Sequence, residues 1–151
     1  AYFDTGLERG AHHIAHSADP GAVGRRVYTY FHAVIVFGIV VMAVGDELIL
    51  AHPIGHLDAS VIATVVGGPA LYVFGNLLFK REIAGFPPLS HLVGLGLLGL
   101  GALVAPLAHR EPLHLGLWAT GALIVVAVWE WLSLSRGAPE ANPHARQKPA
   151  G

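Results

Sequence analysis

The sequence predicts an all-α fold: a polytopic membrane helix bundle with four transmembrane helices and a short N-terminal amphipathic helix. Charged residues make up only 13% of the 151 residues, against about 25% in soluble proteins, which is too little charge to cover a small soluble domain. Four long apolar runs follow one another along the chain. The second and third runs almost lack the polar stripe of a soluble helix, and none shows the strict alternation of a barrel strand.

The composition also excludes several other classes of protein. The chain has no cysteine, which rules out a disulfide scaffold and a cysteine metal site. Its formal net charge of −1 argues against a nucleic-acid-binding protein, which would need a basic face. The long apolar runs exclude an intrinsically disordered chain.

Residues 1–24 are expected to form a cytoplasmic juxtamembrane helix followed by a turn. Thr5 and Glu8 have the spacing of a capping box, in which each side chain satisfies an amide of the first helical turn. An apolar stripe at helical spacing follows them. Asp19-Pro20-Gly21 favours a turn that ends this helix.

The four apolar runs make up the predicted transmembrane domain, residues 25–136. Each is close to the ~20 residues that a helix needs to cross ~30 Å of hydrocarbon. The predicted spans run from Val27 to Leu50, from Ala59 to Phe79, from Leu89 to Ala108, and from Leu113 to Ser135. Residues 137–151 are rich in Pro, Ala and charge, and are expected to form a disordered cytoplasmic tail.

Basic residues at the ends of the runs predict the orientation. Arg25 and Arg26 precede the first span, and Lys80 and Arg81 separate the second from the third. More basic residues follow the fourth span, whereas the other two loops contain a single Arg between them, Arg110. The positive-inside rule therefore places both termini and the middle loop in the cytoplasm.

Three polar residues within the spans are candidate proton-relay or helix-linking groups. They are His32, Asn76 and Glu130, which lie four to six residues from the nearest basic flank. At ~1.5 Å per residue they are roughly 6–9 Å inside the cytoplasmic boundary, so they could meet in one layer with His32 and Glu130 sharing a proton. Alternatively, His32 and Asn76 only tie helices together, and Glu130 reaches the interface.

Asp46 and Glu47 are further intramembrane polar candidates, near the outer end of the first span. His32, Ile39 and Asp46 recur every seven residues, and we expect their stripe to face the bundle. Arg110 is the nearest permanent cation, so an ion pair of Arg110 with one of the two carboxylates is predicted. The alternative is two interfacial carboxylates in contact with water.

Gly67, Gly68 and Pro69 mark a candidate helix kink in the middle of the second span. Pro69 has no amide hydrogen, so the carbonyl of Val65 loses its helical partner. A fully broken helix, as in transporter substrate sites, is the alternative interpretation. Small residues in the third and fourth spans also have the four-residue spacing that lets helix backbones approach, as in Gly101 with Ala105 and Gly116 with Thr120.

The ten histidines raise the question of a metal site. His52 and His56 are separated by Pro53 and Gly55, which make their segment a loop without fixed ligand geometry. His109 and His114 lie on the same predicted outer side. No metal and no cofactor is predicted.

The sequence resembles the bacterial low-temperature-requirement protein A family. The resemblance rests on Tyr28-Thr29-Tyr30-Phe31-His32, on Ala43-Val44-Gly45-Asp46-Glu47, and on the second-span motifs Gly67-Gly68-Pro69-Ala70-Leu71-Tyr72 and Gly75-Asn76-Leu77-Leu78-Phe79-Lys80-Arg81. It covers most of residues 2–135. Members of that family are bacterial integral membrane proteins with many more spans than four, so the resemblance implies that this chain corresponds to their C-terminal portion only. It implies no catalytic residue or substrate.

Two functions remain open at this stage. Intramembrane carboxylates and the Gly-Gly-Pro segment favour a transporter or permease-like domain in the bacterial cell membrane. The alternative is a non-catalytic membrane scaffold or sensory module. An enzyme is not expected, because the spans contain no Gly-x-Ser-x-Gly serine, no cysteine nucleophile and no paired aspartates. The expected partners are the lipid bilayer and either further helices of a longer parent chain or a second copy.

Overall fold

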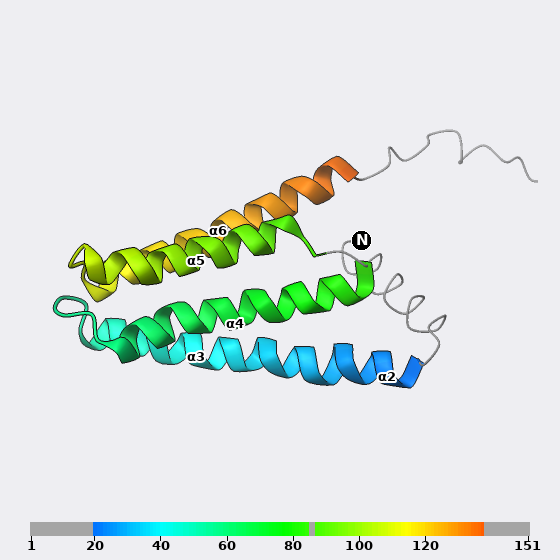
Figure 1. Cartoon of the computed structure of the whole chain (residues 1–151), viewed down its shortest axis with the longest axis horizontal. Coiled ribbons are helices and arrows are strands. Elements are labelled where there is room, and N and C mark those ends of the chain that lie inside the picture. Colours follow the sequence, from blue (N-terminus) through cyan, green and yellow to red (C-terminus); the bar gives the residue numbers. More distant parts are fainter. Residues whose placement is uncertain (1–19, 85–86, 138–151) are drawn as a thin grey trace, which may run out of the picture.

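The computed structural model describes residues 20–84 and 87–137 (Figure 1). The predicted amphipathic helix before Pro20 and the predicted tail beyond Gly137 lie outside the described residues. Pro20 begins a helix where the sequence suggested a turn. This position suits proline, since the first helical residue needs no amide hydrogen and proline's fixed φ fits the helix.

Four helices in the described part of the chain are long and apolar enough to cross a membrane. The first long helix consists of α2 (Pro20–Arg25), a π-helical segment (Arg26–Phe31) and α3 (His32–Ala51), and its candidate membrane span is Thr29–Ala51. It is followed by α4 (Ala59–Ala84), α5 (Leu89–Leu107) and α6 (Pro112–Gly137). The described residues contain no strand. The predicted all-α membrane bundle is therefore confirmed.

The helices form two pairs, with α3 beside α4 and α5 beside α6 (Figure 1). Helix α4 is central because it also contacts α5 and α6. The end of the bundle where α4 stops and α5 starts carries Lys80 and Arg81, and we refer to it as the basic end. The opposite end carries the loops at 52–58 and 108–111, and we refer to it as the loop end. There, the amide of Leu113 donates to the carbonyl of Pro53 at 3.2 Å, which joins the 52–58 loop to the first turn of α6.

Glycines allow the backbones of α3 and α4 to touch. A Cβ built on Gly38 would lie 2.5 Å from the amide nitrogen of Tyr72, and one on Gly68 would lie 2.5 Å from that of Met42. A Cβ on Gly45 would lie 3.0 Å from the amide nitrogen of Val65. At Gly38 and Gly68 an added Cβ would force the facing backbone to move, and at Gly45 it would make a tight contact, so these glycines let the two helices approach closely.

The Gly67-Gly68-Pro69 segment lies within one continuous helix, because α4 extends from Ala59 to Ala84 with Pro69 inside it. Pro69 and Gly68 are buried, and Gly68 lies against the α3 backbone at Met42. The described α4 is thus not divided into two half-helices. The segment serves at least to let α3 and α4 approach.

The core is small and apolar, and its fully buried side chains are Val73, Leu98 and Leu115, one from each of α4, α5 and α6. Many large apolar side chains on the outside of the helices are exposed, among them Phe37, Leu103 and Ile124. Such a surface is unstable in water and suits hydrocarbon. The bundle therefore occupies a lipid bilayer.

Candidate functional site

Four polar side chains from three helices meet near the basic end. Lys80 comes from the last turns of α4, Ser90 and His91 from the first turn of α5, and Glu130 from α6. We call these four residues the basic-end cluster. All four lie within helices long and apolar enough to be membrane spans.

Glu130 is the centre of the basic-end cluster. One of its carboxylate oxygens, Oε2, accepts a hydrogen bond from the ammonium group of Lys80 and forms a salt bridge with it. The other oxygen, Oε1, lies 3.3 Å from the hydroxyl of Ser90 and 3.3 Å from Nδ1 of His91. The Ser90 hydroxyl is also 3.1 Å from Nδ1 of His91. Each carboxylate oxygen therefore has its own partners.

The members of the basic-end cluster differ in exposure. The side chain of His91 is 4% exposed, and Ser90 is buried beside it. The side chains of Lys80 and Glu130 are 33% and 21% exposed. The ion pair is thus at the surface of the cluster, while the imidazole and the hydroxyl form its buried side.

Local backbone structure positions the two α5 residues. Pro88 precedes α5 with an extended backbone (φ −69°, ψ 126°), as residues before a helix often do. Its carbonyl accepts the amide of His91 at 3.1 Å, which closes the first turn and holds Ser90 and His91 against α6. The first turn of a helix carries a partial positive charge, which favours the nearby Glu130 carboxylate.

Of the predicted layer of His32, Asn76 and Glu130, only Glu130 belongs to this cluster. His32 is exposed at the start of α3. Among the described residues it makes no contact with Glu130 through which the two could share the predicted proton. The side-chain amide of Asn76 donates to the carbonyl of Tyr72, one turn earlier in the same helix, at 2.9 Å. The three residues have a similar predicted depth in the membrane, but their side chains point in different directions around the helix axes.

Three members of the basic-end cluster, Lys80, Ser90 and His91, are not among the site residues predicted from the sequence. In the sequence, Lys80 serves only to predict the orientation of the chain in the membrane, and Ser90 and His91 lie at the very start of a predicted span. A signal was present, however: Lys80 and Ser90 are separated by a short connection, which brings the end of one span beside the start of the next.

The stripe of His32, Ile39 and Asp46 is exposed, which corrects the expectation that it faces the bundle. Gly38 and Gly45 lie one residue before Ile39 and Asp46, and these glycines face α4. Adjacent residues point about 100° apart on a helix. The close glycine contacts therefore turn the polar stripe outward.

The outer carboxylates Asp46 and Glu47 are both exposed, as is Arg110. Within the described residues, neither carboxylate forms the ion pair with Arg110 that the sequence suggested. The loop-end histidines His52, His56 and His109 are exposed as well. Across residues 20–84 and 87–137, no group of three or more histidines and carboxylates is arranged to hold a metal ion.

Comparisons with known proteins give a family and one partial relative. The model of the bacterial low temperature requirement A protein (LtrA) family matches residues 1–129. An uncharacterized protein of Rhizobium meliloti (strain 1021), RA0937, is 33% identical over 134 residues, which are 88% of this chain and 32% of that protein. The chain thus spans about a third of that relative's length. No solved structure matches this chain.

Proposed function

The chain belongs to the bacterial low temperature requirement A protein family, and we propose that it acts as a permease-like domain in which Glu130 binds and releases a coupling proton. The observation that carries this proposal is the basic-end cluster. Ionisable residues inside membrane spans are rare, face one another or a water-filled path, and commonly belong to ion or proton pathways. Lys80, His91 and Glu130 have this arrangement.

The basic-end cluster contains the parts that a proton-binding site needs. Lys80 balances the charge of the Glu130 carboxylate within a membrane helix. His91 lies 3.3 Å from Oε1 of Glu130, and imidazole is the side chain best suited to give and take protons near neutral pH.

Protonation of Glu130 would also change the packing of the helices. A neutral carboxyl no longer attracts the ammonium group of Lys80, so the contact between α4 and α6 weakens. Release of the proton restores the ion pair. The two protonation states therefore favour different separations of α4 and α6 at the basic end, which is the element of change that a transport cycle requires. By the positive-inside rule, the basic end faces the cytoplasm in this proposal.

The proposal is tested in liposomes that contain the purified chain and a pH-sensitive dye. Proton flux is measured during addition of amino acids, sugars and monovalent cations, with the membrane potential clamped. We expect flux with at least one solute, and we expect Glu130→Gln to reduce it to the level of empty liposomes. Glu47→Gln is the matched control, since it makes the same chemical change at an exposed carboxylate on α3. Equal flux in both variants would refute the proposal.

The second candidate is a non-catalytic scaffold or sensory module in which the basic-end cluster only fixes α4 to α5 and α6. One observation favours it: no buried side-chain nitrogen or oxygen in the described residues lacks a partner. The exchange Lys80→Glu with Glu130→Lys separates the two candidates. A scaffold would keep its stability and its role, because the ion pair is retained, whereas a proton carrier would lose flux. Wild-type liposomes that remain proton-tight with every solute would favour the scaffold.

A further inference from the structure

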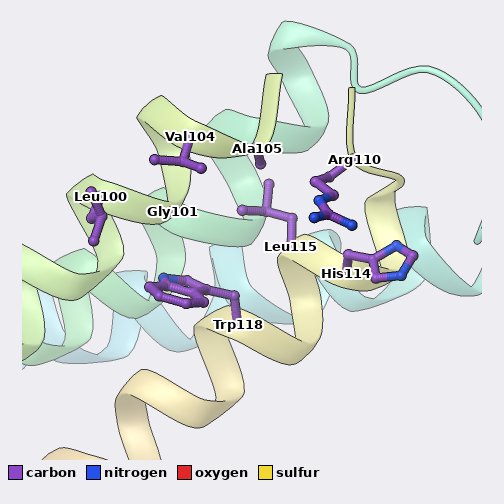
Figure 2. Close-up of a pocket in the computed structure, with 8 residues that line it drawn as sticks. All are labelled: Leu100, Gly101, Val104, Ala105, Arg110, His114, Leu115 and Trp118. Atoms are coloured by element: carbon purple, nitrogen blue, oxygen red, sulfur yellow. The ribbon is translucent and has the colours of Figure 1, made fainter. Parts of the chain in front are cut away.

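A groove lies between α5 and α6 at the loop end, away from the basic-end cluster (Figure 2). Its volume is about 360 Å³, within the ~300–1,000 Å³ of most small-molecule sites. Its walls are apolar except at the end near the loop, where Arg110 and His114 lie (Figure 2). The side chains that shape it are Leu100, Val104, Leu115, Trp118, Arg110 and His114.

The backbone fixes the position of Arg110. Helix α5 ends in a Schellman motif, in which the amide of Arg110 donates to the carbonyl of Ala105 at 2.9 Å and that of His109 to Pro106 at 3.2 Å. His109 adopts a left-handed backbone, with φ of 49°. This conformation turns the chain back, so that Arg110 lies over the end of α5. The way in which the helix ends therefore fixes the backbone of Arg110 at one end of the groove.

The charge of Arg110 is not matched within the described residues. Arg110 has no ion pair there, and the neighbouring carboxylate of Glu111 lies 3.6 Å from Nδ1 of His114 instead. The outer carboxylates Asp46 and Glu47 do not pair with Arg110 either. An unmatched guanidinium at the level of a helix end, where lipid headgroups lie, attracts a phosphate group.

Trp118 shapes the other side of the groove. Its indole lies across Gly101, where a Cβ would be 2.4 Å from the ring, and its Nε1 donates to the carbonyl of Leu97 at 2.8 Å. The ring is thus held flat against α5 beside Leu100 and Val104 (Figure 2). An acyl chain would extend along this apolar surface, while the headgroup stays at Arg110.

We propose that this groove binds an anionic phospholipid, with Arg110 on the phosphate and the surface of Leu100, Val104 and Trp118 along one acyl chain. The charge at one end and the apolar walls along the rest match the two parts of such a lipid. The site is separate from the basic-end cluster, so the proposal does not depend on the proposed transport function.

The test uses Trp118 as its own reporter. The chain with Trp129→Phe and Trp131→Phe retains Trp118 as its one tryptophan, and it is placed in nanodiscs of phosphatidylcholine. Brominated phosphatidylglycerol or brominated phosphatidylcholine is added, and quenching of tryptophan fluorescence is followed. We expect half-maximal quenching at about fivefold less phosphatidylglycerol than phosphatidylcholine, as one basic residue near the headgroups provides. Circular dichroism confirms that the reporter chain is helical.

The controls decide the interpretation. Arg110→Gln should remove the preference for phosphatidylglycerol, whereas Arg81→Gln, the same change at an exposed arginine of the basic end, should retain it. Equal quenching by both lipids in the reporter chain would overturn the proposal, and so would a preference that survives Arg110→Gln. Absence of quenching by either lipid would mean that protein, such as a second copy, covers the groove. Protection by soluble glycerol phosphate at the same concentration would mean that the headgroup alone binds.

Discussion

The two helix pairs of the bundle are joined in different ways. Between α3 and α4, glycines such as Gly38 and Gly68 meet the backbone of the facing helix. Between α5 and α6, glycines meet side chains: a Cβ on Gly94 would lie 2.3 Å from Cγ2 of Val126, and one on Gly101 would lie 2.4 Å from Cδ1 of Trp118. A side chain can rotate away from a neighbour, but a helix backbone cannot without moving the whole helix.

This difference separates a rigid part of the molecule from an adjustable part. The α3–α4 contact contains no polar side-chain bond between the two helices among those found in the described residues, and it depends on close backbone packing. The polar chemistry lies on the other side of α4, where Lys80 meets α5 and α6. The groove at Arg110 also lies between α5 and α6. The groove is thus on the pair whose contacts can adjust, and the basic-end cluster joins that pair to α4.

The largest predicted effect comes from adding a methyl group to the α3–α4 contact. Gly68→Ala should lower the free energy of unfolding by at least about 3 kcal/mol, the upper end of the range for overpacking, because the new Cβ meets the backbone of Met42. Gly67→Ala is the matched control, since a Cβ there has nothing within 4 Å. Unfolding in mixed micelles measures both. Equal stability of the two variants would show that α3 can move away from α4.

The sequence predicts the spans well and the contacts between them poorly. The starts of α4 at Ala59 and α5 at Leu89 agree with the predicted spans, because hydropathy depends on the chain's own composition. The contacts of Gly38 and Gly45 were not predicted. They recur every seven residues, and spacing alone does not say which face of a lipid-solvated helix meets another helix.

The candidate site shows the same limit. Depth below a basic flank can be calculated from residue counts, and it correctly drew attention to Glu130. Depth does not determine rotation about the helix axis, however, so it could not distinguish His32, which is exposed, from His91, which is buried. Lys80 also had two possible roles, as an orienting charge and as a partner for Glu130. Three-dimensional packing was needed to show the second role.

A smaller loss of stability is expected on the adjustable side of α4. Lys80→Met leaves the Glu130 carboxylate without its cation and should lower the free energy of unfolding by about 2 kcal/mol, as for a lost hydrogen bond to a charged group. Arg81→Met, at the adjacent exposed arginine, should change it by less than about 0.5 kcal/mol. The same micelle unfolding assay compares them. A loss in Arg81→Met as large as that in Lys80→Met would mean that the ion pair contributes nothing specific.

The α5–α6 contact should tolerate an added methyl group better than the α3–α4 contact does. Gly101→Ala pushes the exposed indole of Trp118 outward and breaks its bond to the carbonyl of Leu97, which costs about 1–1.5 kcal/mol. Gly99→Ala is the matched control on the same helix, with nothing within 4 Å of the new Cβ. Unfolding and the tryptophan emission maximum are measured together. A loss in Gly101→Ala as large as in Gly68→Ala would remove the distinction between the two pairs.

The smallest predicted effects come from glycine substitutions just after α3 and α5. The change in the free energy of unfolding should have opposite signs at these two helix ends. His109 has a left-handed backbone, with φ of 49°, which costs about 1–2 kcal/mol for a residue with a Cβ. Glycine avoids this cost but loses about 0.5–1 kcal/mol of chain entropy on folding. His109→Gly should therefore raise the free energy of unfolding by about 0.5–1 kcal/mol.

His52, which follows α3, has φ of −140° and carries no such strain. His52→Gly should thus only add chain entropy to the unfolded state and lower the free energy of unfolding by about 0.5–1 kcal/mol. The micelle assay needs only the sign of each change. A stabilising His52→Gly or a destabilising His109→Gly would mean that backbone strain does not distinguish the ends of α3 and α5.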